Sequence, residues 1–403
     1  MDYNPLAPES RANPYPGYAL LRKEAPVYEI QPFGVFAVSR YREVLHILKT
    51  PEVYSSQGMK AMMTGQTGMT NGSVAGRTSV LTESDNLIAS DPPIHDRLRA
   101  VVNRGFTPRR IGALEPRIRK IAVECLSAVA KNGEMDLVAD LSMPLPVRVI
   151  AELLGVPAER LHDFKRWSDA IITSVTGVNQ PTDREHAVRV REEFVDFFAG
   201  AIAERRKRPT DDLISTLIRA EQGEGTLTEG EVLAFSVLLL VAGNETTTNL
   251  LGNALLALTE HPAELSKVVK RPELIEGLVE EVVRYDSPVQ ALFRQTLEDT
   301  ELAGVTIPKG KMVMVLLGSA NRDEEWLPDA SSFDVTRNPK GHVGFGFGIH
   351  FCLGASLARL EARVALEELF RRCRNLERTS ANVEWIDSLI LRGPKTLPLR
   401  FEA

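Results

Sequence analysis

The chain has little cysteine, few aromatic residues and no excess of positive charge. Only three of its 403 residues are cysteine, and this odd, sparse set (Cys125, Cys352 and Cys373) cannot form a disulfide framework. A reducing compartment is therefore expected, and we predict a cytoplasmic protein. The net charge of −6 argues against nucleic acid as the main partner, because surfaces that bind nucleic acid are basic.

The chain also lacks a recognisable secretory signal, a membrane span, a linker and internal repeats. Its first residues contain neither a basic segment nor an apolar core, whereas a signal peptide has both. The longest apolar stretch, residues 232–258, is interrupted by polar side chains between Gly243 and Asn249, and a membrane span needs about 20 apolar residues. We expect a soluble monomer without a membrane partner, folded as a single domain over residues 1–403.

Helical periodicity is present over most of the chain, and runs with strand character are short and few. Strands are predicted at residues 27–30, 34–38, 301–307 and 311–317. The sequence therefore predicts a mainly α fold with a small β region.

The most informative stretch runs from Val343 to Arg359, where a glycine-rich loop leads to Cys352 and then to apolar residues at helical spacing. A helix N-terminus offers unpaired N–H groups and partial positive charge, which favour a thiolate. One cysteine cannot build a zinc or iron–sulfur site, but a single thiolate suits the axial position of haem iron. The alternative is a buried structural cysteine at a tight junction.

A long central helix is predicted between Thr228, which begins a capping box with Glu231, and His261-Pro262. It is apolar on nearly all sides and should be buried. The pair Glu245-Thr246 lies in its middle, where a carboxylate is costly without a partner or a role. A threonine there can also donate to the carbonyl four residues earlier. A purely structural pair is the alternative.

Two further segments carry candidate residues. His95 and Arg99 are four residues apart and share a helical face, which suits an anionic group, although a surface ion pair is the alternative. Residues 55–90 lack periodicity and form either a surface excursion or an adaptable apolar pocket lining. The apolar side chains of that segment are Met59, Met62, Met63, Met69 and Val80.

The run from Phe345 to Gly354 resembles the haem-binding signature of the cytochrome P450 family. Segments around His95, Glu245 and Glu281 resemble other motifs of that family, in the same order along the chain. The resemblance implies the cytochrome P450 fold, with the long central helix over the haem and the cysteine loop below it. It also implies haem b as the cofactor, with Cys352 as the axial thiolate.

The resemblance further implies roles for individual residues. Ala242 and Gly243 would form the oxygen groove, Thr246 would hydrogen-bond bound oxygen, and Glu245 would deliver protons. The residues implied to contact the haem are His95, Arg99, Arg294, His350, Phe345, Gly346, Gly354 and Ala242. Those implied to flank the substrate are Val289, Leu292, Phe293, Leu238, Ile390 and Leu391. A structural cluster of Glu281, Arg284 and Arg337 would brace the segment leading to Cys352.

The implied function is that of a monooxygenase, which inserts one atom of dioxygen into a C–H or C=C bond of a small-to-medium apolar molecule, as in secondary metabolism. The sequence contains no flavin or iron–sulfur motif, so electrons would come from NAD(P)H through an external ferredoxin and ferredoxin reductase. The basic residues expected to attract the ferredoxin are Arg104, Arg109, Arg110, Arg359, Arg363 and Arg372. A peroxide-driven enzyme of the same fold and a non-catalytic haem-thiolate protein are alternatives, and the pair Glu245-Thr246 favours the monooxygenase.

Overall fold

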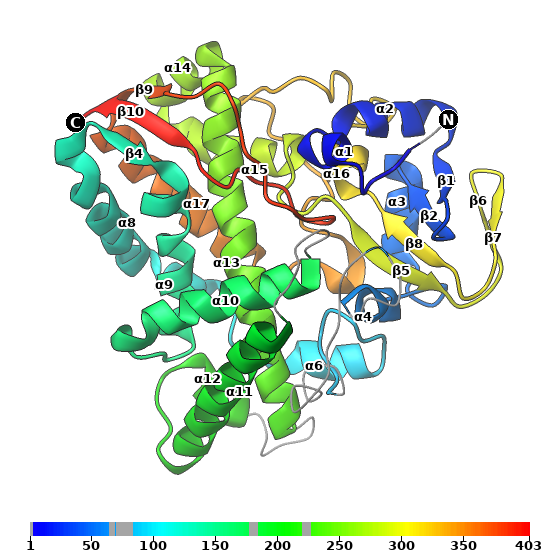
Figure 1. Ribbon diagram of the computed structural model, residues 1–403, viewed down its shortest axis with the longest axis horizontal. Helices are drawn as coiled ribbons and strands as arrows, with labels where there is room; N and C mark the ends of the chain where they lie inside the picture. Colours follow the sequence, from blue (N-terminus) through cyan, green and yellow to red (C-terminus); the bar gives the residue numbers. More distant parts are fainter. Residues whose placement is uncertain (1–2, 64–68, 70–83, 177–183, 220–226) are drawn as a thin grey trace.

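The computed structural model describes residues 3–63, 69, 84–176, 184–219 and 227–403. A large helical body is joined to a smaller β-containing region, and one long helix, α13, runs between them (Figure 1). The predicted mainly α fold with a small β region is therefore confirmed. None of the described helices is both long and apolar enough to cross a bilayer.

Helix α13 (Glu229–Glu260) begins and ends where the sequence predicts. The Thr228 side chain accepts a hydrogen bond from the backbone N–H of Glu231, and the Glu231 carboxylate accepts one from the backbone N–H of Thr228. This capping box satisfies donors that the first turn leaves unpaired. Most side chains of α13 are buried, as its nearly continuous apolar surface requires.

The other helices pack around α13 or cover the sheets. In chain order they are α1 (Pro8–Ala12), α2 (Tyr15–Glu24), α3 (Tyr41–Lys49), α4 (Gln57–Met63), α6 (Ile94–Asn103), α7 (Pro108–Gly112), α8 (Glu115–Val129), α9 (Pro144–Leu153), α10 (Leu161–Thr176), α11 (Arg184–Lys207), α12 (Leu213–Arg219), α14 (Pro262–Lys270), α15 (Ile275–Tyr285), α16 (Leu317–Ala320) and α17 (Ala355–Arg372). Helices α9, α10, α15 and α17 all contact α13. The cavity described below lies where α13 faces the start of α17.

The described strands form one five-stranded sheet and two smaller ones. The large sheet has the order β1-β2-β8-β5-β3, in which only β2 and β8 pair in parallel. Its strands are β1 (Val27–Ile30), β2 (Val35–Val38), β3 (Tyr54–Ser55), β5 (Leu292–Thr296) and β8 (Met312–Val315). A second sheet joins β4 (Glu134–Asp136), β10 (Pro398–Glu402) and β9 (Arg374–Arg378).

One predicted strand is wrong. Residues 301–307 form a two-stranded hairpin of β6 (Thr300–Leu302) and β7 (Val305–Ile307). Ala303 and Gly304 have φ values of 50° and 77°, and a left-handed pair of this kind reverses the chain. Alanine rarely adopts this conformation, so Gly304 was the only residue of the pair that indicated a turn in the sequence.

The apolar core has three parts. The largest cluster joins the helices around α13, and the other two lie on opposite faces of the large sheet. One of these sheet clusters contains Met59, Met62, Met69 and Phe293. The large sheet therefore places its strand β5, and the helix α4 that packs against β5, beside the cavity.

Candidate active site

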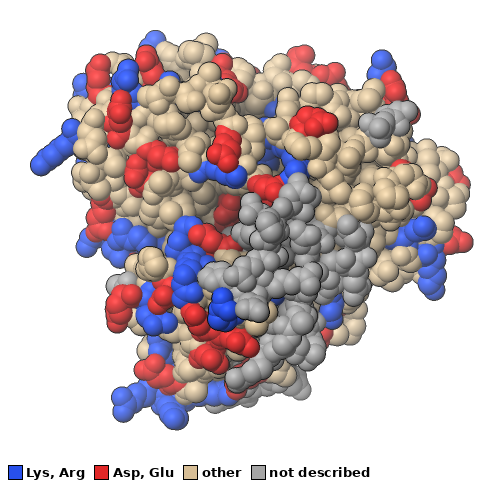
Figure 2. All heavy atoms as spheres, in the orientation of Figure 1, with Lys and Arg blue, Asp and Glu red and all other residues tan. Residues whose placement is uncertain are grey.

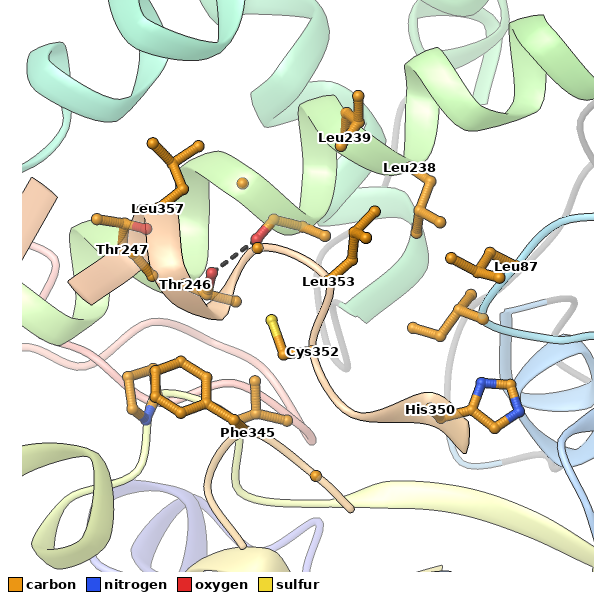
Figure 3. Close-up of a pocket in the computed structure, with 18 of the residues that line it drawn as sticks. Leu87, Leu238, Leu239, Thr246, Thr247, Phe345, His350, Cys352, Leu353 and Leu357 are labelled. Carbon is orange, nitrogen blue, oxygen red and sulfur yellow. Dashed lines mark hydrogen bonds between the residues drawn. The ribbon is translucent and has the colours of Figure 1, made fainter. Parts of the chain in front are cut away.

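A cavity lies between the middle of α13 and the loop that carries Cys352 (Figure 3). About 1400 Å³ of it is free of protein atoms, part of which is open to solvent. Side chains of α13, of β5 and of the cysteine loop line it together.

The cysteine loop is held in shape by its backbone. The N–H of Cys352 donates to the carbonyl of Phe345 at 2.9 Å. Gly348 has a φ of +69°, and a Cβ there would lie 2.5 Å from the carbonyl oxygen of Leu48, so only glycine fits without rearrangement. Gly354 is the N-cap of α17. Cys352 is thus placed directly before a helix N-terminus, as the sequence predicts.

Two opposing effects set the pKa of Cys352. Burial raises the pKa of the thiol, although hydrogen bonds from the backbone N–H groups of Gly354 and Ala355 and the charges of Arg99 and Arg359 oppose it. The helix N–H groups therefore favour the thiolate, as the sequence predicts, but burial of the sulfur outweighs them. A metal ion at the sulfur supplies a stronger charge and deprotonates a coordinating thiol outright.

Donor side chains gather at one edge of the cavity. Arg99, Arg294 and His350 line this edge, and His95 lies behind His350, with 4.4 Å between the ring centroids. Arg294 is buried, with an exposed fraction of 4%, and its guanidinium donates to the carbonyl of Phe293. The Nε2 atom of His95 is buried without a hydrogen-bond partner among the described residues.

The electrostatics of this edge suit a bound anion. Burial, together with the charges of Arg294, His95 and Arg99, lowers the pKa of His350 to about 3. Burial also lowers the pKa of Arg294 to about 10, although the carboxylate of Asp91 opposes the shift. An anionic group would relieve the repulsion between the Arg99 and Arg294 guanidiniums and accept hydrogen bonds from them. The carboxylates of a haem have the required charge.

Only one face of the polar segment of α13 lines the cavity. Ala242, Gly243 and Thr246 line the cavity, and the hydroxyl of Thr246 donates to the carbonyl of Ala242 at 2.6 Å (Figure 3). A Cβ on Gly243 would lie 2.7 Å from the side chain of Ile150, so this glycine also permits close packing against α9.

Glu245 does not line the cavity. Burial raises its pKa, and the charge of Asp169 on α10 adds to this effect, whereas Lys165 opposes it. Glu245 therefore holds its proton more tightly than an exposed carboxylate and lies next in sequence to Thr246. This places a protonatable group between α10 and the cavity.

The three residues expected to form a structural cluster lie together. Arg284 is fully buried and donates to both carboxylate oxygens of Glu281, at 2.8 and 2.7 Å. Its remaining donors reach the carbonyls of Asn321, Ala330 and Ser332. The Nε atom of Arg337 lies 3.3 Å from Glu281. A buried charged pair is tolerated only when its hydrogen bonds are satisfied, as these are.

The six residues predicted to flank the substrate divide into two groups of three. Leu238, Val289 and Leu292 line the cavity, but Phe293, Ile390 and Leu391 do not. Side chains alternate along a strand, so Leu292 and Arg294 face the cavity while Phe293 points to the other face of β5. There it packs with Ile390 and Leu391 in a sheet cluster.

The described methionines that were named as a possible pocket lining lie away from the cavity. Met59, Met62 and Met69 are buried in the same sheet cluster as Phe293, and none of them lines the cavity. Val80 lies outside the described residues, as does part of the segment after α10. The cavity wall instead includes residues that sequence reasoning missed, which are Leu87, Ile88, Ile150, Phe235, Leu239, Leu250, Leu353, Leu357 and Glu361.

The residues present fit a haem. Phe345, Gly346, Cys352 and Gly354 line the lower wall, and Ala242 lines the upper one. Within the described chain, no three His, Cys, Asp or Glu side chains gather as a metal site of their own. Iron held by one cysteine therefore needs the remaining ligands that a porphyrin provides.

An apolar cavity between a lone cysteine and a helical threonine preceded by a glutamate is the arrangement expected of a haem-thiolate oxygenase. The chain belongs to the cytochrome P450 family, since the family model described as Cytochrome P450 matches residues 45–401. The family accounts for the fold and for the cysteine-ligated haem, and this protein is an oxidoreductase that incorporates oxygen.

Individual relatives agree over nearly the whole chain. The vitamin D(3) 25-hydroxylase of Pseudonocardia autotrophica is 39% identical, covering 96% of this chain and 93% of its own. The structure of CYP109Q5 from Chondromyces apiculatus has a TM-score of 0.90 and 43% identity, over 99% of this chain and 98% of that one. The structure of CYP109E1 from Bacillus megaterium in complex with testosterone has a TM-score of 0.87 and 38% identity, over 98% and 99%.

Proposed function

We propose that this protein is a monooxygenase that inserts one atom of dioxygen into a C–H or C=C bond of a neutral, largely apolar molecule of steroid size. Cys352 is the proposed iron ligand. The observation that carries the proposal is the apolar cavity between Cys352 and the α13 segment that contains Thr246. When bound, the haem supplies the redox chemistry that activates dioxygen.

The protein residues then have distinct proposed tasks. The thiolate of Cys352 would donate electron density to the iron, and the Arg99 and Arg294 guanidiniums, with the two histidine rings beside them, would hold the haem carboxylates. Glu245 carries a proton from the side of α10, and the Thr246 hydroxyl passes it into the cavity. The upward shift of the Glu245 pKa supports this role, because it moves the carboxyl towards the range that suits a proton donor.

The cavity wall supports a neutral substrate. On the side of Leu87 and Leu238 the lining residues are apolar (Figure 3), and the described lining has cations only in Arg99 and Arg294, at the haem-carboxylate edge. A fatty acid would leave its carboxylate unpaired there, at a large desolvation penalty. The testosterone complex and the vitamin D hydroxylase among the relatives also support a steroid-like molecule.

An external ferredoxin is the proposed electron donor, but fewer cations are free for it than the sequence suggests. Arg110, Arg359, Arg363 and Arg372 are paired with Asp211, Glu280, Glu115 and Glu368, respectively. Arg104 and Arg109 are exposed and form no ion pair with another described residue. We propose that these two arginines attract an acidic donor.

The ligand assignment is tested by the optical band of the reduced, carbon-monoxide-bound protein. Cys352→Ala should lose the band that a thiolate ligand gives, whereas Cys125→Ala, the matched control, should keep it. A thiolate band that survives in Cys352→Ala would show that the iron ligand is another residue.

The substrate and the electron source are tested separately. Testosterone should shift the haem spectrum towards the high-spin form, and palmitate should do so far more weakly. Product formation should require NADH, ferredoxin and reductase together. Equal turnover with hydrogen peroxide alone would identify a peroxide-driven enzyme instead.

A further inference from the structure

One carboxylate contacts both ends of the cysteine loop. Glu280 on α15 accepts hydrogen bonds from Nε and Nη2 of Arg359 at 2.5 and 2.8 Å. It also lies 3.0 Å from Nε2 of His342. His342 precedes Cys352 in the chain, and Arg359 follows it on α17. Glu280 therefore joins the entry of the loop to its exit.

The hydrogen bonds of His342 define its protonation. The backbone N–H of Gly344 donates to its Nδ1 atom at 3.3 Å, and a backbone N–H can only donate. Nδ1 must therefore be unprotonated, so the ring proton lies on Nε2 and is donated to Glu280. His342 is neutral in this arrangement and adds no charge.

The charges of Glu280 and Arg359 cancel one another. Burial raises the pKa of Glu280, but Arg359 and His342 outweigh this and hold the pKa at about 2, so the carboxylate is ionised. The guanidinium of Arg359 lies 4.4 Å from the ring centroid of Phe345, and its charge also acts on Cys352. A full positive charge thus lies behind the cysteine loop, neutralised by Glu280.

We propose that Glu280, Arg359 and His342 form a neutral clasp that sets the reduction potential of the iron held by Cys352. The inference rests on the proposed role of Cys352. Reduction of the iron adds negative charge, so an unbalanced cation behind the sulfur favours the reduced state, and an unbalanced anion favours the oxidised state. Glu280 and Arg359 are positioning residues in this sense, because they act through the cysteine loop.

The test is the midpoint potential of the holoprotein, measured by spectroelectrochemistry. Glu280→Gln leaves Arg359 unbalanced and should raise the potential, whereas Arg359→Gln leaves Glu280 unbalanced and should lower it. At an applied potential equal to the wild-type midpoint, we expect the ferrous-to-ferric ratio to change about threefold in opposite directions, or ~30 mV for one electron. The double variant should return towards the wild-type midpoint.

Three controls separate charge from folding. Arg359→Lys keeps the charge and His342→Gln changes none, so both should keep the wild-type midpoint. Arg371→Gln removes a cation that pairs with Glu368 elsewhere on α17 and should also have little effect.

Two outcomes would overturn the clasp. One is an unchanged midpoint in both Glu280→Gln and Arg359→Gln, and the other is a shift of the same sign in the two variants. A wild-type protein without the thiolate band would instead refute the proposed role of Cys352.

Discussion

At the scale of single residues, the hydroxyl of Thr246 has a task that its geometry makes testable. It donates to the Ala242 carbonyl while lining the cavity, so it can turn towards a bound molecule without leaving α13. Thr246→Ala should keep haem and substrate binding but release hydrogen peroxide in place of product, with a fall of about tenfold or more in product per NADH.

The same helix supplies the control for that experiment. Thr259 also donates to the carbonyl four residues earlier, but it does not line the cavity. Thr259→Ala should leave product per NADH unchanged. If product per NADH falls equally in both variants, the loss comes from a change in α13 and not from a proton relay at Thr246.

Glu361 makes the stability of the protein depend on pH. It lines the cavity, one of its carboxylate oxygens is buried without a hydrogen-bond partner among the described residues, and burial raises its pKa from 4.5 to about 8. Between these two pH values the unfolded chain has lost the proton that the folded protein retains. The free energy of unfolding should therefore fall as pH rises, by up to about 1.4 kcal/mol per pH unit.

Glu361→Gln keeps the shape and removes the titration. Its advantage over the wild type in denaturant unfolding should thus grow from pH 5 to pH 8. Glu298→Gln, at an exposed position, should follow the wild-type profile. Parallel profiles of Glu361→Gln and wild type would mean that Glu361 is ionised in the folded protein.

At the scale of elements, α13 depends on its capped first turn. Thr228→Ala removes one half of the capping box and should lower the free energy of unfolding by about 1 kcal/mol. Thr228→Ser keeps the hydroxyl and should behave as wild type in the same denaturant titration. An equal loss in both variants would point to the methyl group of Thr228 instead of its hydrogen bond.

The elements also show how far a sequence can be interpreted. The ends of α13 were predictable because Thr228, Glu231 and the His261-Pro262 pair act locally. The direction in which the Phe293 side chain points was not predictable. The sequence shows that side chains alternate along β5, but which face of the strand meets the cavity depends on how the sheet packs. Residues such as Leu87 and Glu361 carry no local signal at all, since only the tertiary fold brings them to the cavity.

The site shows the same division. The motif around Cys352 identified the loop, and its glycines explain the backbone. Whether burial or the helix N–H groups dominates the pKa of Cys352 depends on how deeply the sulfur is buried. No sequence motif gives that depth. The pairing of Arg359 with Glu280 likewise joins two helices that are far apart in sequence.

At the scale of the whole molecule, charge pairing limits where a redox partner can bind. Lys and Arg lie among Asp and Glu on the face in Figure 2, without one large patch of either sign. Arg104→Glu combined with Arg109→Glu should slow reduction by ferredoxin about tenfold or more at low salt. Lys309→Glu, in the turn between β7 and β8, should have little effect.

Reduction by dithionite provides the reference for this experiment. Because this small reductant needs no docking surface, its rate should be equal in all of these variants. If the arginine variant also loses dithionite reduction, its haem site is damaged and the docking surface lies elsewhere.

The wall of the cavity draws on chain from Leu87 to Glu361, which has a consequence for biosynthesis. A ribosome adds about 5–20 residues per second, so the helices made first wait on the order of tens of seconds for the cysteine loop to emerge. Haem can be captured between these walls only after that wait, once the cysteine loop has been translated. The yield of folded protein in a growing cell should therefore follow the supply of haem during expression.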